Sequence, residues 1–253
     1  NIAEPYGMGR FPTFSHWDNV QAQRRLLAEV FGVERLALVY GWSMGAQQAL
    51  HWAAIFPDQV DNICAVCGSA RTSPHNKVFL EGIRATLTAD PAWQNGGFTA
   101  RPVRGLRAMG RLYAGWAMSQ AFYREGKHLE LGFASLEDYL VRVWEANFLR
   151  RDGDDLLSML ATWYQSDISD NEIYQGDLAA ALGAIKARAI IMPSRTDLYF
   201  TPEDSAAESI QMPNAVFRPI ESIWGHRAGN PTDNTDDEAY LRNAVQALLT
   251  GGA

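Results

Sequence analysis

Short apolar runs alternate with helical patterns in the first part of the chain. Apolar residues recur at helical spacing over residues 17–31, and the pattern stops at Gly32, a residue typical of helix ends. Residues 36–40 are continuously apolar, as in a strand that is buried on both faces of a parallel sheet. A helical pattern over residues 46–56 and a second apolar run over residues 60–67 follow. Strand, turn, helix and strand form a βαβ unit, so we expect a parallel sheet with a right-handed crossover.

The strand signal disappears between residues 72 and 183. Several segments in this stretch have helical spacing and are rich in Trp, Tyr and Met. They cover residues 113–122, 136–148 and 156–164. We interpret residues 72–183 as a helical lid that is inserted into the sheet domain.

Strand signals return after the lid. Residues 189–192 and 215–218 read as two further strands, and an amphipathic helix is expected over residues 237–249. The sequence therefore predicts one α/β domain, formed by residues 1–71 and 184–253. We expect a mostly parallel sheet with helices on both faces.

Composition and charge narrow the classes of function. Of 253 residues, 47% are hydrophobic and 20% are charged, which is ordinary for a globular protein that is folded throughout. The formal net charge of −7 argues against a nucleic-acid partner, which needs a basic face to neutralise phosphates. No apolar run reaches the roughly eighteen residues that a membrane-spanning helix needs, and no charged-then-apolar leader opens the sequence. We expect a soluble, cytoplasmic enzyme with no membrane partner.

Cys64 and Cys67 have the CxxC spacing of some redox and metal sites. They lie inside the apolar run over residues 60–67, and no further ligands of the same kind are nearby. We expect both thiols to be small core residues, with no metal bound.

Residues 41–45 read Gly-Trp-Ser-Met-Gly and lie between the first predicted strand and the next helix. This is the Gly-x-Ser-x-Gly pattern of the nucleophile elbow in the α/β-hydrolase fold. The glycines are needed because bulky side chains would clash in so sharp a turn, which holds the serine strained and exposed. We predict that Ser43 is a nucleophile and that the backbone N–H of Met44 donates to the oxyanion. The alternative is that these residues form only a tight turn.

A serine nucleophile needs a histidine to accept its proton and an acid to orient that histidine. In the α/β-hydrolase fold, the acid and then the histidine follow the serine along the chain. Asp197 follows the strand expected at 189–192, and His226 follows the strand expected at 215–218. Both then fall on the sheet edge that carries Ser43. We predict that Asp197 is the orienting acid and His226 the general base.

Other titratable residues fit these roles less well. The remaining histidines precede the later strands or lie within a helix, and we expect them to be structural or exposed: His16, His51, His75 and His128. The other acids that could orient His226 lie in the lid or on a helix expected beyond Pro202: Asp167, Asp170, Glu203 and Asp204. Arg195 is a candidate for binding a carboxylate, and a solvated loop cation is an equally supported alternative.

The sequence resembles the homoserine O-acetyltransferase family of α/β-hydrolase-fold enzymes, and the likeness runs nearly end to end. It rests on the elbow with its helix, the entry to the lid and three later landmarks: residues 41–53, 68–71, 89–93, 185–187, 197–202 and 225–226. The resemblance implies ping-pong acyl transfer from an acyl-CoA to a small hydroxyl acceptor through acyl-Ser43, with the lid forming a tunnel over the nucleophile. It implies acyl-CoA as a co-substrate and no bound cofactor. The lid is a candidate surface for a homodimer.

Two positions depart from the family's pattern. Arg227 follows the predicted catalytic histidine where homoserine-using members typically have Asp, which reverses the local charge. The family's lid arginine aligns with Gly110, and Arg107 or Arg111 would replace it if the helix register shifts. We expect homoserine to be a poor acceptor because its ammonium would be repelled by a guanidinium. The residues predicted to contact substrate are Arg227, Arg111, Tyr199 and Trp42.

The sequence begins without Met, shortly before the elbow helix. Other α/β hydrolases place several strands and a second oxyanion donor ahead of this point, so we expect those parts to be truncated or to lie on a separate piece. Three functions stay open. An acyl-CoA-dependent O-acyltransferase is the main expectation, an esterase with the same triad is the alternative, and a non-catalytic relative of the fold is the third. Exclusion of water by the lid separates the first two, and an intact triad disfavours the last.

Overall fold

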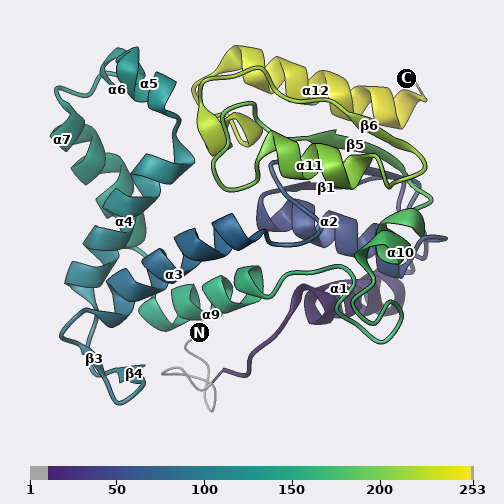
Figure 1. Cartoon of the computed structure of the whole chain (residues 1–253), viewed down its shortest axis with the longest axis horizontal. Coiled ribbons are helices and arrows are strands. Elements are labelled where there is room, and N and C mark those ends of the chain that lie inside the picture. Colours follow the sequence, from purple (N-terminus) through teal and green to yellow (C-terminus); the bar gives the residue numbers. More distant parts are fainter. Residues whose placement is uncertain (1–10, 252–253) are drawn as a thin grey trace.

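A four-stranded parallel sheet forms the centre of one half of the molecule (Figure 1). The computed structural model describes residues 11–251. The strands are hydrogen-bonded in the order β1-β2-β5-β6, and each neighbouring pair is parallel. Their bounds are β1 (Val39–Trp42), β2 (Asn62–Val66), β5 (Arg188–Met192) and β6 (Ala215–Phe217). The predicted parallel α/β sheet is therefore confirmed.

Helices cover both faces of this sheet, because alternate strand residues point to opposite sides. Ile63 packs in the cluster that contains α2 (Met44–Ile55), and α1 (His16–Phe31) lies against α2 on the same side. Cys64 packs in the opposite cluster, with α12 (Thr235–Thr250). Figure 1 shows α12 and α2 on either side of the strands. Both faces of the two central strands are thus buried, as expected.

The first strand differs from its prediction. It begins at Val39 rather than residue 36 and continues through Gly41 to Trp42, while Leu36 makes only an isolated bridge to Val60. Tyr40 is 47% exposed, so the expected burial on both faces is wrong here. The reason is that β1 is the edge of the described sheet, and α12 packs mainly over its neighbours.

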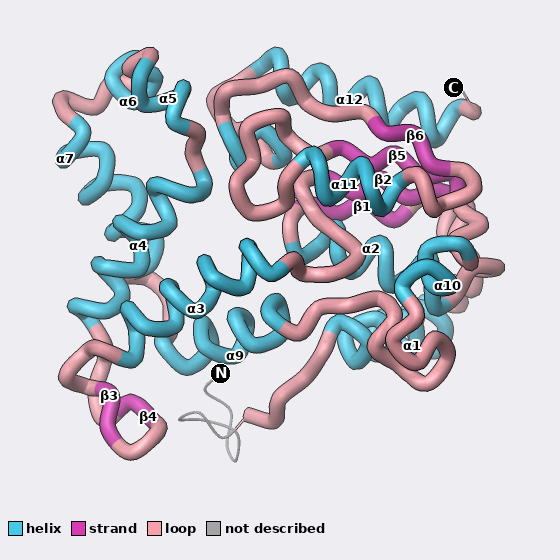
Figure 2. Tube along the Cα trace, in the orientation of Figure 1, coloured by secondary structure: helices cyan, strands magenta, loops and turns pink. Residues whose placement is uncertain are grey.

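A second, helical half lies between β2 and β5 and has its own aromatic cluster (Figure 2). The helical segments predicted at 136–148 and 156–164 are present, whereas the one at 113–122 is interrupted at residues 118–119, where the chain leaves the α-helix. Helix α3 (Pro74–Thr88), which runs beside α9, is an additional helix. The remaining bounds are α4 (Val103–Ala117), α5 (Gln120–Arg124), α6 (Lys127–Glu130), α7 (Leu136–Tyr139), α8 (Ala146–Phe148) and α9 (Gly153–Tyr164). A π-helical stretch (Leu140–Glu145) joins α7 to α8.

The helical half also contains a short hairpin, so the expectation of no strands there is wrong. Its strands are β3 (Trp93–Gln94) and β4 (Gly97–Phe98). The turn between them is Asn95-Gly96, and both residues have positive φ, 53° and 85°. Asn-Gly between two short runs is a strong hairpin signal, because both central residues of the turn need positive φ.

The two ends of the helical half return to the same place. The N–H of Thr72 donates to the carbonyl of Ser166 at 2.9 Å, and the N–H of Ile168 donates to that of Ala70 at 3.0 Å. Ile168 and helix α10 (Leu178–Gly183) pack in the cluster under the sheet. The chain thus rejoins the sheet-side core before residue 183, and the predicted lid boundary at 183 stays a prediction. Within residues 11–251, no helix is long and apolar enough to cross a membrane.

Candidate active site

The carboxyl ends of the four strands meet at one edge of the sheet. Ser43 directly follows β1, and Cys67 directly follows β2. Asp197 lies in the loop between β5 and α11 (Pro202–Ser209), and His226 lies in the short 3₁₀ helix η2 (Gly225–Gly229) after β6. Because the strands are parallel, these loops gather at the same edge, where ligands bind in open α/β sheets.

Ser43 has the strained backbone of a nucleophile elbow, with φ 60° and ψ −126°. Its N–H donates to the carbonyl of Val66 at 2.9 Å, which ties the turn to the neighbouring strand. A Cβ on Gly41 would lie 2.0 Å from the carbonyl oxygen of Gly45, so a side chain is excluded there. A Cβ on Gly45 would meet nothing within 4 Å. The expectation that both glycines relieve a clash is therefore correct for Gly41 and wrong for Gly45.

A third glycine supports the elbow and was missed as such from the sequence. A Cβ on Gly68 would lie 2.4 Å from the Cβ of Ala46 and 2.9 Å from the carbonyl oxygen of Ser43. Met44 is the first residue of α2, so its N–H belongs to the helix turn whose amides lack intrahelical partners. The positive end of the helix dipole adds to the attraction for an anion there.

Asp197 is 3% exposed and its carboxylate is fully engaged. One oxygen, Oδ2, accepts a hydrogen bond from Nδ1 of His226 at 2.7 Å. The other, Oδ1, accepts from the backbone N–H of Tyr199 at 2.8 Å and of Phe200 at 3.3 Å. This arrangement places the proton of a neutral imidazole on Nδ1, so Nε2 keeps its lone pair and can accept a proton.

Aromatic rings hold the imidazole of His226 in place. The indole of Trp42 lies 5.0 Å from it and the phenol ring of Tyr199 packs edge-on at 4.8 Å. Trp42 Nε1 also donates to the backbone carbonyl of His226 at 3.1 Å. Trp42 and Tyr199, which we predicted as substrate contacts, therefore support the histidine as well.

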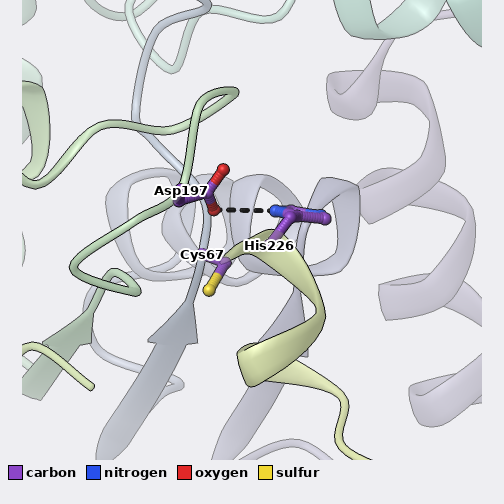
Figure 3. Close-up of side chains that lie close together, drawn as sticks. All are labelled: Cys67, Asp197 and His226. Atoms are coloured by element: carbon purple, nitrogen blue, oxygen red, sulfur yellow. Dashed lines mark hydrogen bonds and ion pairs between the residues drawn. The ribbon is translucent and has the colours of Figure 1, made fainter. Parts of the chain in front are cut away.

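Cys67 is close to this pair, as Figure 3 shows. One ligand atom each from Cys67, Asp197 and His226 lie within 4.8 Å of one another, which raises the question of a metal site. Burial, together with the charge of Asp197, holds the pKa of the Cys67 thiol well above its usual range. Nδ1 of His226 and Oδ2 of Asp197 are already hydrogen-bonded to each other at 2.7 Å, so these two atoms are not available as a pair of ligands. The donor set does not fit a metal.

The expected role of the cysteines as small core residues agrees with the structure. Cys64 and Cys67 are both free and buried. Burial raises the pKa of Cys64 to about 12, so both thiols are protonated at neutral pH.

A cavity of about 690 Å³ is lined by Ser43 and His226. Three of the four predicted substrate contacts, Trp42, Tyr199 and Arg227, also line it. Much of the remaining wall is aromatic and comes from the helical half, including Tyr113, Tyr139, Phe148 and Trp163. The lid thus supplies much of the wall around the serine, and the volume is ordinary for a small-molecule site.

Arg111, the fourth predicted substrate contact, is placed elsewhere and does not line this cavity. Its guanidinium is paired with Glu145 at 2.5 Å and with Glu137 at 2.5 Å. Arg107 also pairs with Glu145, which is only 2% exposed. A buried carboxylate needs such partners, so both arginines are used to neutralise it. A Cβ on Gly110 would lie 2.7 Å from the carbonyl oxygen of Trp144, which explains why this position is glycine.

Comparison with known proteins identifies the family. Residues 10–227 match the family model described as the alpha/beta hydrolase fold. The chain belongs to the α/β-hydrolase fold family. The α/β-hydrolase fold that the sequence around Ser43 predicted is therefore confirmed.

Relatives of this α/β hydrolase include esterases and acyltransferases. It is 41% identical over 211 residues to an ethyl acetate hydrolase from Pseudomonas veronii, a match that covers 83% of this chain and 60% of that protein. The structure of an acetylester hydrolase from Corynebacterium glutamicum superposes with a TM-score of 0.92 at 33% identity, covering 98% of this chain and 71% of the other. A homoserine O-acetyltransferase from Symbiobacterium thermophilum is 33% identical over 243 residues, covering 88% and 62%.

These comparisons change the order of the expected functions. The chain spans about 60% of the length of the curated relatives it matches. The more similar relatives are esterases, and the acyltransferases are less similar. The expected resemblance to homoserine O-acetyltransferases is present, but the findings favour the esterase alternative over the acyltransferase that was the main expectation.

Proposed function

We propose that this chain is the catalytic part of a serine esterase that hydrolyses short acyl esters, with acetyl esters as its first candidates. The observation that carries the proposal is the hydrogen bond between Asp197 and His226 at 2.7 Å, at the same aromatic cavity as the strained Ser43. Similarity to ester hydrolases supports the choice of reaction.

The first half-reaction forms an acyl-enzyme. Nε2 of His226 takes the proton of Ser43 as its Oγ attacks the ester carbonyl, and the backbone N–H of Met44 donates to the oxyanion that develops. The imidazolium is stabilised by Asp197, and it then gives its proton to the departing alcohol. In the second half-reaction, His226 deprotonates a water molecule that attacks acyl-Ser43. The imidazolium then returns this proton to Oγ of Ser43 as the bond to the acyl group breaks and the acid is released.

Acyl transfer to an alcohol is the second candidate, because the first half-reaction is shared and a homoserine O-acetyltransferase is among the relatives. The two differ only in whether water or an alcohol resolves acyl-Ser43. On the esterase proposal no CoA ester is required.

The test compares both reactions in the full-length protein. Acetate release from ethyl acetate and p-nitrophenyl acetate is measured beside formation of O-acetylhomoserine from acetyl-CoA and homoserine. We expect ester hydrolysis to exceed acetyl transfer by orders of magnitude. Faster acetyl-CoA-dependent transfer would reject the esterase proposal and restore the acyltransferase.

A further inference from the structure

The charge of the active-site cavity is opposite to that of the whole chain. The chain has a formal net charge of −7. Among the described residues, the charged side chains that line the cavity are those of Arg142, Arg150, Arg227 and Asp233. The cavity in which substrate must bind is therefore lined by three guanidinium groups and one carboxylate.

Arg227 is the half-buried member of this group, and it follows His226 directly in the chain. Its guanidinium carbon lies 5.7 Å from the centre of the Trp42 ring, and Nη2 makes a long contact of 3.4 Å with the hydroxyl of Thr232. Among residues 11–251, this guanidinium makes no ion pair with a carboxylate, although the charge of Asp233 acts on it from a greater distance. Burial lowers the pKa of Arg227 from its usual value, and the groups of Tyr139 and Asp233 only partly oppose that effect.

Several other arginines of the lid are paired with carboxylates. Arg107 and Arg111 pair with Glu145, and the exposed Arg142 lies 3.3 Å from Asp138. Taking a charge out of water without a counter-charge is costly, so such groups are normally paired. Among the described residues, Arg227 is therefore a half-buried cation without a directly paired carboxylate, and Asp233 acts on it only from a greater distance.

The position of Arg227 links it to the reacting groups. The ring of Trp42 lies 5.0 Å from the imidazole of His226, and the guanidinium of Arg227 lies over the same indole ring. The guanidinium is thus one indole ring away from the general base. Arg150, an exposed arginine that lines the same cavity, adds positive charge that favours the approach of an anion.

We propose that Arg227 binds a carboxylate carried by the substrate, so that the preferred substrates are anionic esters. This inference rests on the proposed esterase function. The carboxylate belongs to either the alcohol portion or the acyl portion of the ester, and a guanidinium recognises it equally in both by a charge-assisted hydrogen bond.

The experiment compares pairs of esters in which the second carboxyl group is either a free carboxylate or esterified. The alcohol arm uses O-acetylglycolate and its neutral methyl ester, and the acyl arm uses monoethyl succinate and neutral diethyl succinate. We expect kcat/KM of the full-length protein to favour the anionic ester by about tenfold or more in one arm, because a charge-assisted hydrogen bond is stronger than one between neutral groups. That arm identifies the portion that carries the carboxylate.

Variants then assign the preference to Arg227. Arg227→Gln should reduce the ratio of anionic to neutral kcat/KM about tenfold or more, mainly through KM, and Arg227→Lys should restore part of it. The matched control is Arg195→Gln, since Arg195 is an exposed arginine paired with Glu221 outside the cavity, and it should leave the ratio unchanged.

The outcomes separate this inference from the proposed function. Hydrolysis of neutral esters without any preference for the anionic ones would overturn the inference and leave the esterase in place. A preference that survives in Arg227→Gln would also overturn it. Failure to hydrolyse every ester would instead reject the esterase proposal on which the inference rests.

Discussion

Acidification should weaken the fold through two buried histidines, His16 and His51, and the clearer case is His16, at the start of α1. The ring of His16 is 1% exposed, and its Nε2 lies 3.3 Å from Oε1 of Gln47. The ring of a second buried histidine, His51, packs edge-on at 5.3 Å. Burial and then the charge of His51 lower the pKa of His16 from 6.5 to about 4. The folded protein therefore resists a proton that the unfolded chain accepts.

The size and sign of the effect follow from these two pKa values. Between about pH 4 and pH 6.5 the unfolded chain binds more protons at this position than the folded protein, so stability falls as the pH falls. Above that window His16 is neutral in both states, and below it His16 is charged in both. Acidification from pH 6.5 to about pH 4, at about 1.36 kcal/mol per pH unit, lowers the free energy of unfolding by roughly 3 kcal/mol.

The assay is denaturant unfolding of the protein and of His16→Gln at several pH values from 7 to 4. The difference between the two is the useful quantity, because another group titrates in the opposite sense. Burial raises the pKa of Glu208 to about 7, which makes its own contribution to stability fall as the pH rises from about 4.5 to 7. Glu208 is present in both proteins and cancels in the difference.

We expect the stability advantage of the unmodified protein over His16→Gln to shrink by about 3 kcal/mol between pH 7 and pH 4. The matched variant His75→Gln, which removes an exposed histidine of α3, should not reproduce this curve. An advantage of His16 that is constant over the whole range would refute the reasoning.

Two further predictions concern the triad and the elbow. Asp197→Asn should lower kcat by about 10³- to 10⁴-fold with little change in KM, because the imidazole of His226 is no longer held with its proton on Nδ1. The control Asp204→Asn should leave kcat unchanged, and equal effects of the two variants would contradict the assignment. Gly41→Ala should lower stability by about 1–3 kcal/mol or more, measured by thermal unfolding, since its Cβ would lie 2.0 Å from the carbonyl oxygen of Gly45. Gly45→Ala, with nothing within 4 Å, should not lower it, and the reverse order would contradict our account.

The sequence was sufficient to predict that the three candidate reacting groups lie at one edge of the sheet, because this placement depends on local rules. Ser43, Asp197 and His226 each follow a short apolar run, and parallel strands bring their carboxyl ends to one edge. The hairpin at Asn95-Gly96 also had a local signal, which the aromatic and helical character of its surroundings obscured.

Contacts between distant residues could not be predicted in this way. The ion pair of Arg111 with Glu145, 34 residues away, keeps this arginine out of the cavity and depends on how α4 packs against the π-helical stretch. The approach of Cys67 to the pair formed by Asp197 and His226 depends on the relative positions of three loops. No spacing along the chain encodes either contact, because each depends on tertiary packing.

The central claim, that Ser43 carries the acyl group, is tested most directly by mass spectrometry of the full-length protein quenched during turnover of p-nitrophenyl acetate. We predict an acetyl group on the peptide that contains Ser43, and loss of both the adduct and the hydrolysis in Ser43→Ala. Ser194→Ala, which removes a buried hydroxyl at the end of β5, should keep both. An acetyl group on another residue, or substantial turnover by Ser43→Ala, would contradict the account.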